Sequence, residues 1–305
     1  MMKRSELGLG TWQFGPSHGF WTEAGEEKAQ TLLRFALARG IRHIDTAPAY
    51  GNGLSEQRIG SVLASLPNRS EVHISSKFMP KTVATVRQDV EKSLARLKTD
   101  YLDTLYLHWP SSTIPLKPIL ASAYQLVEEG LVRTLGLCNT PLDLLNTLDD
   151  IPFTYLQVPC SLLWIRELAA IKAFAKERSL KLVGYSPLGL GLLGGHHREK
   201  PHDGRASLYV YAPEVYPSFL KLLDTLGQLA TKKGCSSAQM ALLWAQHQNF
   251  STILVGARST QQLKESLAGT ELVLDEEEES LLDEMAGRLV AHIPASCDNL
   301  FGYRW

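Results

Sequence analysis

Short apolar runs alternate with amphipathic segments along almost the whole chain, and this alternation restricts the fold more than any other feature. Eight of the runs are typical of buried β-strands. The first seven begin roughly 25 to 35 residues apart, which is the length of one β-α unit. The predicted strands are Leu7–Thr11, Ile41–Asp45, Val72–Lys77, Leu102–His108, Val132–Leu137, Tyr155–Val158, Leu180–Tyr185 and Thr252–Val255.

The segments between the strands have the spacing of amphipathic helices. Thr82 and Pro141 are typical of first helical positions, and Gly40 and Gly130 are typical of helix ends. One long connection, Ser186–Pro217, is rich in glycine, proline and histidine, and loops of this length are usually functional or disordered. The predicted helices are Glu23–Arg39, Ser55–Leu66, Thr82–Leu97, Lys117–Glu129, Pro141–Leu148, Arg166–Arg178, Ser218–Lys232, Ser236–Gln248, Thr260–Leu267 and Asp275–Leu289.

This order of elements predicts an α/β protein with a (β/α)8 TIM barrel, a long loop after the seventh strand and extra C-terminal helices. A doubly wound open sheet has the same alternation of strands and helices. It would place a G-x-G-x-x-G motif at the start of the first helix, whereas Gly8 and Gly10 are followed by Thr-Trp-Gln-Phe-Gly. We therefore expect one barrel domain over residues 1–305.

Composition and charge exclude several classes of protein. Apolar residues make up 44% of the 305 residues and charged residues 21%, which is the balance of a globular protein. The net charge of −1 gives no reason to expect a nucleic-acid or membrane partner. No run approaches the ~18 apolar residues of a membrane span, and the N-terminus has no apolar segment typical of a secretory signal.

The cysteines and histidines argue against disulfides and metals. Four separated cysteines without a CxxC pair predict free thiols in a reducing compartment, the cytoplasm. His196, His197 and His202 form a local cluster in the long loop, but no carboxylate or cysteine completes a metal site there. We expect this loop to be solvated and to bind no metal.

Ionisable side chains stand at the carboxyl ends of the predicted strands, which converge on one mouth in a barrel. Asp45 ends the second strand, Lys77 the third and His108 the fourth, while Tyr50 follows in the loop after the second. Each residue alone is adequately explained as a polar strand edge. As a set they are chemically complementary, and they suit the donation of a proton to a carbonyl oxygen that is receiving a hydride.

The chemistry of this set follows from its pKa values. A phenol with a pKa near ~10 exchanges protons poorly at neutral pH. We expect the Lys77 ammonium to lower the pKa of Tyr50 by roughly 2–3 units, and Asp45 to keep Lys77 charged. His108 would share the proton or orient the carbonyl. A purely structural ion pair between Asp45 and Lys77 is the alternative.

These residues resemble the catalytic tetrad of the aldo-keto reductase superfamily. Asp-Thr-Ala-Pro-Ala-Tyr-Gly contains Asp45 and Tyr50, the next strand ends in Lys77, and Leu-His108-Trp-Pro follows. The likeness extends to Leu-Gly-Leu-Gly-Thr-Trp, Gly-Leu-Cys-Asn, Tyr-Ser-Pro-Leu-Gly and Gly-Ala-Arg. It implies an NAD(P)H-dependent oxidoreductase that reversibly reduces an aldehyde or ketone, with hydride from the nicotinamide and the proton from Tyr50.

The resemblance also implies the contacts of the nicotinamide. Asn139 and Gln157 would hold its carboxamide, and Tyr185 would stack on its ring. Cys138 stands where the family usually has serine, which weakens one expected hydrogen bond to the carboxamide.

The phosphates of the cofactor would meet two later segments. Ser186–Leu193 would pass over the pyrophosphate, and the helix start at 259–260 would bind a phosphate. Arg258 favours NADP over NAD because it could pair with a 2′-phosphate, whereas Gln262 and Ser266 depart from the family pattern. The expected cofactor-binding residues are Gly10, Thr11, Cys138, Asn139, Gln157, Tyr185, Ser186, Pro187, Leu188, Gly191, Gly256, Arg258 and Gln262.

Aromatic residues are expected around the substrate, a small carbonyl compound. Trp12 and Trp109 lie beside strand ends and are predicted walls of the pocket, and Phe301, Tyr303 and Trp305 are predicted to form a lid. We expect a monomer or a weak homo-oligomer.

Two other functions use the same residues. A nucleotide-binding regulatory or sensor subunit, which would resemble the β subunits of potassium channels, keeps the tetrad but acts through a partner. A metal-dependent barrel hydrolase or isomerase would need several metal ligands at strand ends, and only Asp45 and His108 qualify.

Overall fold

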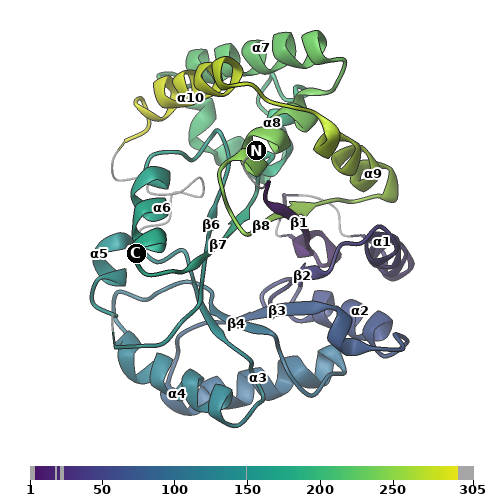
Figure 1. Cartoon of the computed structure of the whole chain (residues 1–305), viewed down its shortest axis with the longest axis vertical. Helices are drawn as coiled ribbons and strands as arrows, with labels where there is room; N and C mark the ends of the chain where they lie inside the picture. Colours follow the sequence, from purple (N-terminus) through teal and green to yellow (C-terminus); the bar gives the residue numbers. More distant parts are fainter. Residues whose placement is uncertain (1–3, 18, 21–23, 149, 295–305) are drawn as a thin grey trace.

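The strands close into a parallel barrel (Figure 1). The computed structural model describes residues 4–17, 19–20, 24–148 and 150–294. Each strand pairs with the next one in sequence, and β8 pairs with β1. The predicted (β/α)8 TIM barrel is therefore confirmed, and the open sheet is excluded. The strands are β1 (Glu6–Gly10), β2 (His43–Asp45), β3 (His73–Phe78), β4 (Thr104–Leu107), β5 (Leu135–Cys138), β6 (Tyr155–Pro159), β7 (Lys181–Tyr185) and β8 (Thr252–Gly256).

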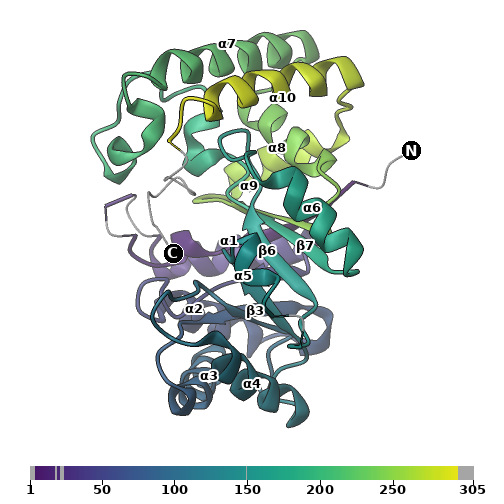
Figure 2. The ribbon, with the colours of Figure 1, turned by 90° about the vertical axis from the view of Figure 1, so that its left-hand side faces the viewer.

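Helices surround the barrel, and the predicted extra C-terminal helices are present after β8. The last helix, α10, lies beside α7 at one end of the molecule in both views (Figures 1 and 2). No helix in the described part of the chain is long and apolar enough to cross a membrane. The helices are α1 (Glu26–Ala38), α2 (Leu54–Leu63), α3 (Val83–Leu97), α4 (Leu116–Glu128), α5 (Leu142–Leu145), α6 (Leu168–Glu177), α7 (Tyr216–Lys233), α8 (Ser237–His247), α9 (Thr260–Ala268) and α10 (Glu276–Val290).

The connection after β7 is more structured than the sequence indicated. It contains three short 3-10 helices, Gly189–Gly194, Gly204–Ser207 and Tyr209–Tyr211. The prediction that the loop extends to Pro217 was wrong, because α7 already begins at Tyr216. A proline in the first turn is compatible with the helix, since the N–H that it lacks would have no partner there.

Several strands and helices are shorter than predicted, most clearly β4, β5 and α5. β4 and β5 begin later than expected, and before them Leu102 and Val132 form only an isolated parallel bridge. Helix α5 is a single turn. Beyond it the N–H of Thr147 donates to the carbonyl of Leu144, three residues earlier, and this tighter pattern ends the α-helix.

A large and a small residue pack together inside the barrel. Tyr106 on β4 is fully buried, and a Cβ placed on Gly136 of β5 would lie 2.3 Å from the Cε1 atom of its ring. Only glycine leaves room for this phenol. Burial, and then the Asp45 carboxylate, raise the pKa of Tyr106 well above its ordinary value, so this phenol stays protonated inside the barrel.

A buried carboxylate ties the outer helices to β3 beside Lys77. Glu56 on α2 is fully buried, accepts a hydrogen bond from the Ser76 hydroxyl at 2.6 Å and pairs with Arg96 of α3 at 2.6 Å. A buried charge is tolerated only when it is paired and hydrogen-bonded in this way. The result is a fixed position for the strand that carries Lys77.

The close approach of α2 and α3 generates a test of the packing. A Cβ on Gly60 of α2 would lie 2.2 Å from the backbone oxygen of Arg96. We expect Gly60→Ala to destabilise the protein by about 1–3 kcal/mol, because backbone atoms must shift to relieve the contact. Urea unfolding followed by circular dichroism measures the change.

Gly227→Ala on α7 is the matched control. Apart from the chain neighbours and the backbone of its own helix, no heavy atom lies within 4 Å of a Cβ at this position. The higher helix propensity of alanine should therefore stabilise the protein by up to about 1 kcal/mol. Equal effects of the two substitutions would contradict the proposed backbone clash at Gly60.

Candidate functional site

Three of the ionisable residues meet at the C-terminal mouth of the barrel. Asp45 is the last residue of β2, Lys77 lies one residue before the end of β3, and both are only 2% exposed. The Lys77 ammonium donates hydrogen bonds to the Asp45 carboxylate, to the Thr46 carbonyl at 2.9 Å and to the Tyr50 hydroxyl at 3.3 Å. Its three N–H donors therefore all have partners.

Burial and the ion pair set the charges of these groups. Burial alone would lower the pKa of Lys77, but the Asp45 carboxylate and Tyr50 outweigh it and raise this pKa overall. The amine therefore stays an ammonium at neutral pH. Burial raises the pKa of Tyr50 to about 12, although the Lys77 charge acts in the opposite direction.

The expectation that Lys77 brings the pKa of Tyr50 below its ordinary value was wrong. Burial raises the pKa of the half-buried phenol more than the Lys77 charge lowers it, and the nearby Asp45 carboxylate raises this pKa further. Tyr50 is consequently a neutral phenol, with its proton in place, across the physiological pH range.

His108 lies directly after β4, and its ring centroid is 5.9 Å from that of Tyr50. Burial, and then the positive charge of Lys77, hold the pKa of His108 well below its ordinary value. The imidazole is therefore neutral at neutral pH and has one N–H donor and one acceptor nitrogen. This state suits the orientation of a carbonyl better than the sharing of a second proton.

A chain of hydrogen bonds leads from Asp45 to the residues expected around the nicotinamide. The Gln157 amide of β6 donates to the second Asp45 oxygen at 2.8 Å. The Cys138 thiol of β5 donates to Gln157 Oε1 at 3.4 Å and accepts from the Asn139 amide at 3.1 Å. These contacts join both amides expected to hold the carboxamide to the ion pair.

Asn139 is the end of this chain, and its backbone is unusual. Its φ of +55° lies in the left-handed region, which asparagine tolerates better than most residues. Its amide also donates to the backbone oxygen of His108 at 3.1 Å, and its Oδ1 accepts from the Tyr185 hydroxyl at 2.6 Å. Tyr185 at the end of β7 is thereby held against the mouth.

Gly10 and Thr11 lie at the end of β1, next to Asp45. Thr11 is fully buried, and its hydroxyl donates to the Asp45 carbonyl at 2.8 Å and accepts from the Ser55 hydroxyl at 2.9 Å. The side chain of Thr11 therefore fixes the backbone of Asp45. A Cβ on Gly10 would meet no atom closer than 3.8 Å, which leaves space at this strand end.

The residues expected near the 2′-phosphate lie at the end of β8 and the start of α9. Gly256 ends β8, and Arg258 and Gln262 are exposed. The Gln262 side chain accepts a hydrogen bond from the Arg258 N–H at 2.9 Å, and Ser259 caps α9 by accepting from the Gln262 N–H at 3.2 Å. Among the described residues, no side-chain hydrogen bond joins Arg258 or Gln262 to the Asp45 chain.

The segment expected over the pyrophosphate has a backbone that few residues adopt. Ser186, Leu190 and Gly191 all have positive φ values. Pro187 is buried, and the carbonyl of Leu188 accepts from the Gly191 N–H at 2.9 Å. The segment thus forms a compact turn instead of an open loop.

A side chain that was not predicted from the sequence supports this turn. The Arg205 guanidinium donates to the Leu190 carbonyl at 3.2 Å and pairs with Asp203 at 2.5 Å. It also contacts His197 Nε2 at 3.0 Å, so His197 accepts a hydrogen bond and is part of the turn's support. The sequence Asp203-Gly204-Arg205 was the available signal, because an aspartate commonly caps the start of a helix, here the 3-10 helix Gly204–Ser207.

Aromatic side chains lie beside Tyr50 and His108. The ring of Trp12 lies 6.3 Å from that of Tyr50, and the ring of Trp109 lies 6.3 Å from that of His108, measured between centroids. The predicted lid residues, Phe301, Tyr303 and Trp305, lie outside the described residues.

Metal ligands do not gather at the mouth. Across residues 4–17, 19–20, 24–148 and 150–294, no group of three or more histidine, cysteine, aspartate or glutamate side chains could hold a metal ion. Burial also raises the pKa of Cys138 and Cys160, so both are protonated thiols at neutral pH.

Nearly the whole chain is similar to known aldo-keto reductases. The model of the aldo/keto reductase family matches residues 6–286. The aldo-keto reductase YhdN of Bacillus subtilis is 30% identical over 280 residues, which cover 86% of this chain and 84% of that protein.

Solved structures have the same architecture. The glycerol dehydrogenase AKR11B4 from Gluconobacter oxydans has a TM-score of 0.82 at 27% identity, with 95% of this chain and 93% of that chain covered. An aldo/keto reductase from Klebsiella pneumoniae, solved in complex with NADP and acetate, has a TM-score of 0.73 at 25% identity, with 92% and 90% covered. The chain belongs to the aldo/keto reductase family.

Proposed function

We propose that this protein is an NADP-dependent carbonyl reductase in which Tyr50 is the proton donor. Hydride adds to the carbonyl carbon of an aldehyde or ketone, and the Tyr50 proton passes to the carbonyl oxygen, so that an alcohol and a phenolate result. The observation that carries this proposal is the contact of Lys77 Nζ with the Tyr50 hydroxyl at 3.3 Å, made by an ammonium that Asp45 also holds.

The residues at the mouth fit a nicotinamide dinucleotide. When bound, this cofactor supplies the hydride. Asn139 and Gln157 present amides for a carboxamide, and the Tyr185 ring offers a face for stacking. A Cβ on Gly256 would lie 2.0 Å from the side-chain nitrogen of Gln13, so the Gln13 amide packs directly against this glycine. The buried Oε1 of Gln13 meets no hydrogen-bond donor among the described residues. A ribose hydroxyl would satisfy that oxygen.

NADP is favoured over NAD by the exposed end of β8. Arg258 directly precedes the N-cap of α9, where free N–H groups and the helix dipole attract a phosphate. Its guanidinium can pair with a 2′-phosphate that NAD lacks. The Klebsiella pneumoniae relative, solved with NADP, supports the same cofactor class.

The other tetrad residues act on Tyr50 and on the substrate. Lys77 stabilises the phenolate that remains after proton transfer, and Asp45 keeps Lys77 charged and in place. His108, neutral in this environment, donates a hydrogen bond that orients the carbonyl oxygen toward Tyr50.

Tyr50→Phe tests the proton donor. We expect the loss of the hydroxyl to lower kcat for NADPH-dependent reduction of a panel of aldehydes and ketones by about 10²–10⁴-fold. The dissociation constant of NADPH, measured by fluorescence quenching, should change little. If the wild-type protein and Tyr50→Phe both bound NADPH tightly and neither reduced a carbonyl, the regulatory subunit would be favoured instead.

Lys77→Met should lower kcat by a similar factor, because the phenolate loses its ammonium partner. The same change strands the buried Asp45 carboxylate, which costs about 3–5 kcal/mol of stability. The double variant Asp45→Asn with Lys77→Met is the control, because it removes both charges. We expect the double variant to recover most of the melting temperature and none of the turnover. Recovery of turnover would show that Lys77 has only a structural role.

The pH dependence of the two reaction directions should differ. Reduction requires the neutral phenol, and because the pKa of Tyr50 is about 12, kcat should be flat from about pH 6 to pH 9. Alcohol oxidation requires the phenolate, so its rate should rise by roughly tenfold per pH unit over the same range. Stopped-flow measurement of hydride transfer in both directions checks this. A decline of the reductive rate with a midpoint near pH 7 would indicate a different proton donor.

A further inference from the structure

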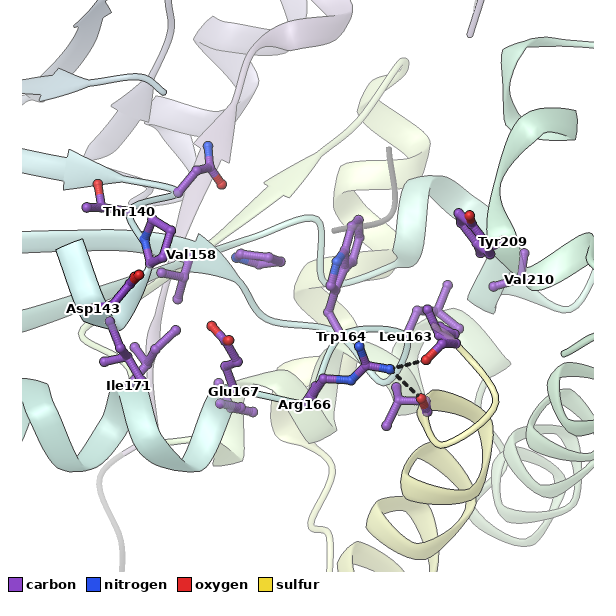
Figure 3. A pocket seen from close by; sticks show the side chains of 17 residues that line it. Thr140, Asp143, Val158, Leu163, Trp164, Arg166, Glu167, Ile171, Tyr209 and Val210 are labelled. Carbon is purple, nitrogen blue, oxygen red and sulfur yellow. Dashed lines mark hydrogen bonds between the residues drawn. The ribbon is translucent and has the colours of Figure 1, made fainter. Parts of the chain in front are cut away.

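The strand ends of the mouth are supported differently on its two sides. On the side of β5 and β6, a cavity of about 470 Å³ lies between the strand ends and the C-terminal end of α10 (Figure 3). On the side of β2 and β3, which carry Asp45 and Lys77, the side chains of Glu56 and Arg96 join β3 to the helices α2 and α3. The Glu56 carboxylate is fully buried there. The strand that carries Lys77 is therefore backed by a packed and charged contact.

Glu56 fixes the strand residue next to Lys77. Successive residues of a strand point to opposite faces, so Lys77 points into the barrel and Ser76 points outward, toward α2. The Ser76 hydroxyl donates to one Glu56 oxygen at 2.6 Å, and Arg96 Nε donates to the other at 2.6 Å. Ser76 and Glu56 are both fully buried, so the loss of either partner leaves a polar group without a replacement from water.

The same pair supports the loop that carries Tyr50. The N–H of Ser55, which precedes Glu56 in α2, donates to the Tyr50 carbonyl at 3.2 Å. Gly53, three residues after Tyr50, has a φ of +88°, and a Cβ placed on it would lie 2.7 Å from the Cδ atom of Arg96. The Arg96 side chain therefore packs directly on this loop while its guanidinium holds Glu56.

The contact between Lys77 and Tyr50 tolerates little movement. Lys77 Nζ lies 3.3 Å from the Tyr50 hydroxyl oxygen, which is already beyond the usual N–H···O range of about 2.7–3.2 Å. The two residues are 27 positions apart in the sequence and belong to different segments of backbone. Their spacing therefore depends on the contacts that hold the strand and the loop together.

We infer that Glu56 and Arg96 are positioning residues for the reaction, which hold the Tyr50 hydroxyl within reach of the Lys77 ammonium. The inference rests on the proposed carbonyl reduction with Tyr50 as the proton donor. Glu56 joins α2 to β3 through Ser76, and Arg96 joins α3 to α2 and to the loop after β2. Both act through the backbone segments that carry the phenol and the amine.

Glu56→Gln tests the inference with NADPH and the panel of aldehydes and ketones. The neutral amide keeps an acceptor for Ser76 but turns N–H donors toward Arg96, so the contact with Arg96 is lost. We expect Tyr50 to move away from Lys77 and kcat to fall by about 10–100-fold. The KM for the carbonyl compound and the dissociation constant of NADPH should change little. Ser76→Ala deletes only the hydroxyl, should lower kcat by a smaller factor, and carries the same test if Glu56→Gln does not fold.

Asp103→Asn is the matched control at the opposite end of β3. Asp103 is buried, accepts a hydrogen bond from the Ile74 N–H at 2.9 Å and pairs with Arg69 at 2.9 Å. Like Glu56, it is a carboxylate that joins β3 to an arginine, but it does so at the end of the strand away from Lys77. We expect both substitutions to lower the melting temperature and only Glu56→Gln to lower kcat.

A double-mutant cycle separates positioning from general weakening of the fold. In the double variant Asp45→Asn with Lys77→Met, no ammonium contacts the phenol. Glu56→Gln should therefore lower the residual kcat of that variant by less than about threefold. An equal loss in the wild-type and the double-variant background would show that Glu56 does not act through Lys77, and would overturn the inference.

The outcomes separate the two proposals. No reduction of any carbonyl compound by the wild-type protein would overturn the proposed function itself. Reduction by the wild-type protein together with an unchanged kcat in folded Glu56→Gln and Ser76→Ala would leave the reductase intact and overturn the positioning role. A loss of kcat in Asp103→Asn as large as that in Glu56→Gln would mark a general response to lost stability and would also overturn it.

Discussion

The buried ammonium of Lys77 is the constraint on which the rest of the mouth depends. A charge removed from water must be neutralised and fully hydrogen-bonded. Asp45 neutralises it, the Thr46 carbonyl accepts a hydrogen bond from the second N–H, and the third N–H donates to the Tyr50 hydroxyl. The contacts that make the charge tolerable are therefore the same contacts that fix the phenol. A structural ion pair and the proposed catalytic one are compatible here, since one geometry would serve both.

The closed barrel is what completes this arrangement. β2 and β3 are neighbours, so Asp45 and Lys77 would also meet in an open parallel sheet. The second Asp45 oxygen, however, accepts from Gln157 on β6 at 2.8 Å. β2 and β6 lie on opposite sides of an eight-stranded barrel, and only closure brings their ends together. The carboxylate is thus held from two directions, and the amide network is tied to it.

The sequence predicted the parts of this site that depend on strand order. Alternating strands and helices predicted the barrel, and the ionisable strand ends predicted that Asp45, Lys77 and His108 would converge with Tyr50. It did not predict the pKa of Tyr50, because the balance between burial and Lys77 depends on how much water the folded mouth excludes. Nor did it predict the support of Arg205 for Leu190, since that contact depends on how a long loop folds back on itself.

The high pKa of Tyr50 and its contact with Lys77 act at different stages of the proposed reaction. Before proton transfer the phenol is neutral, because burial keeps its pKa high. An uncharged phenol interacts only weakly with the Lys77 ammonium. Once the proton leaves, a phenolate stands 3.3 Å from an ammonium. Two unit charges at that distance attract by about 5 kcal/mol at an effective dielectric constant of about 20. Because this attraction exists only as negative charge develops on the oxygen, it stabilises the transition state more than the bound substrate. Burial that raises the pKa is therefore compatible with catalysis of reduction by this phenol.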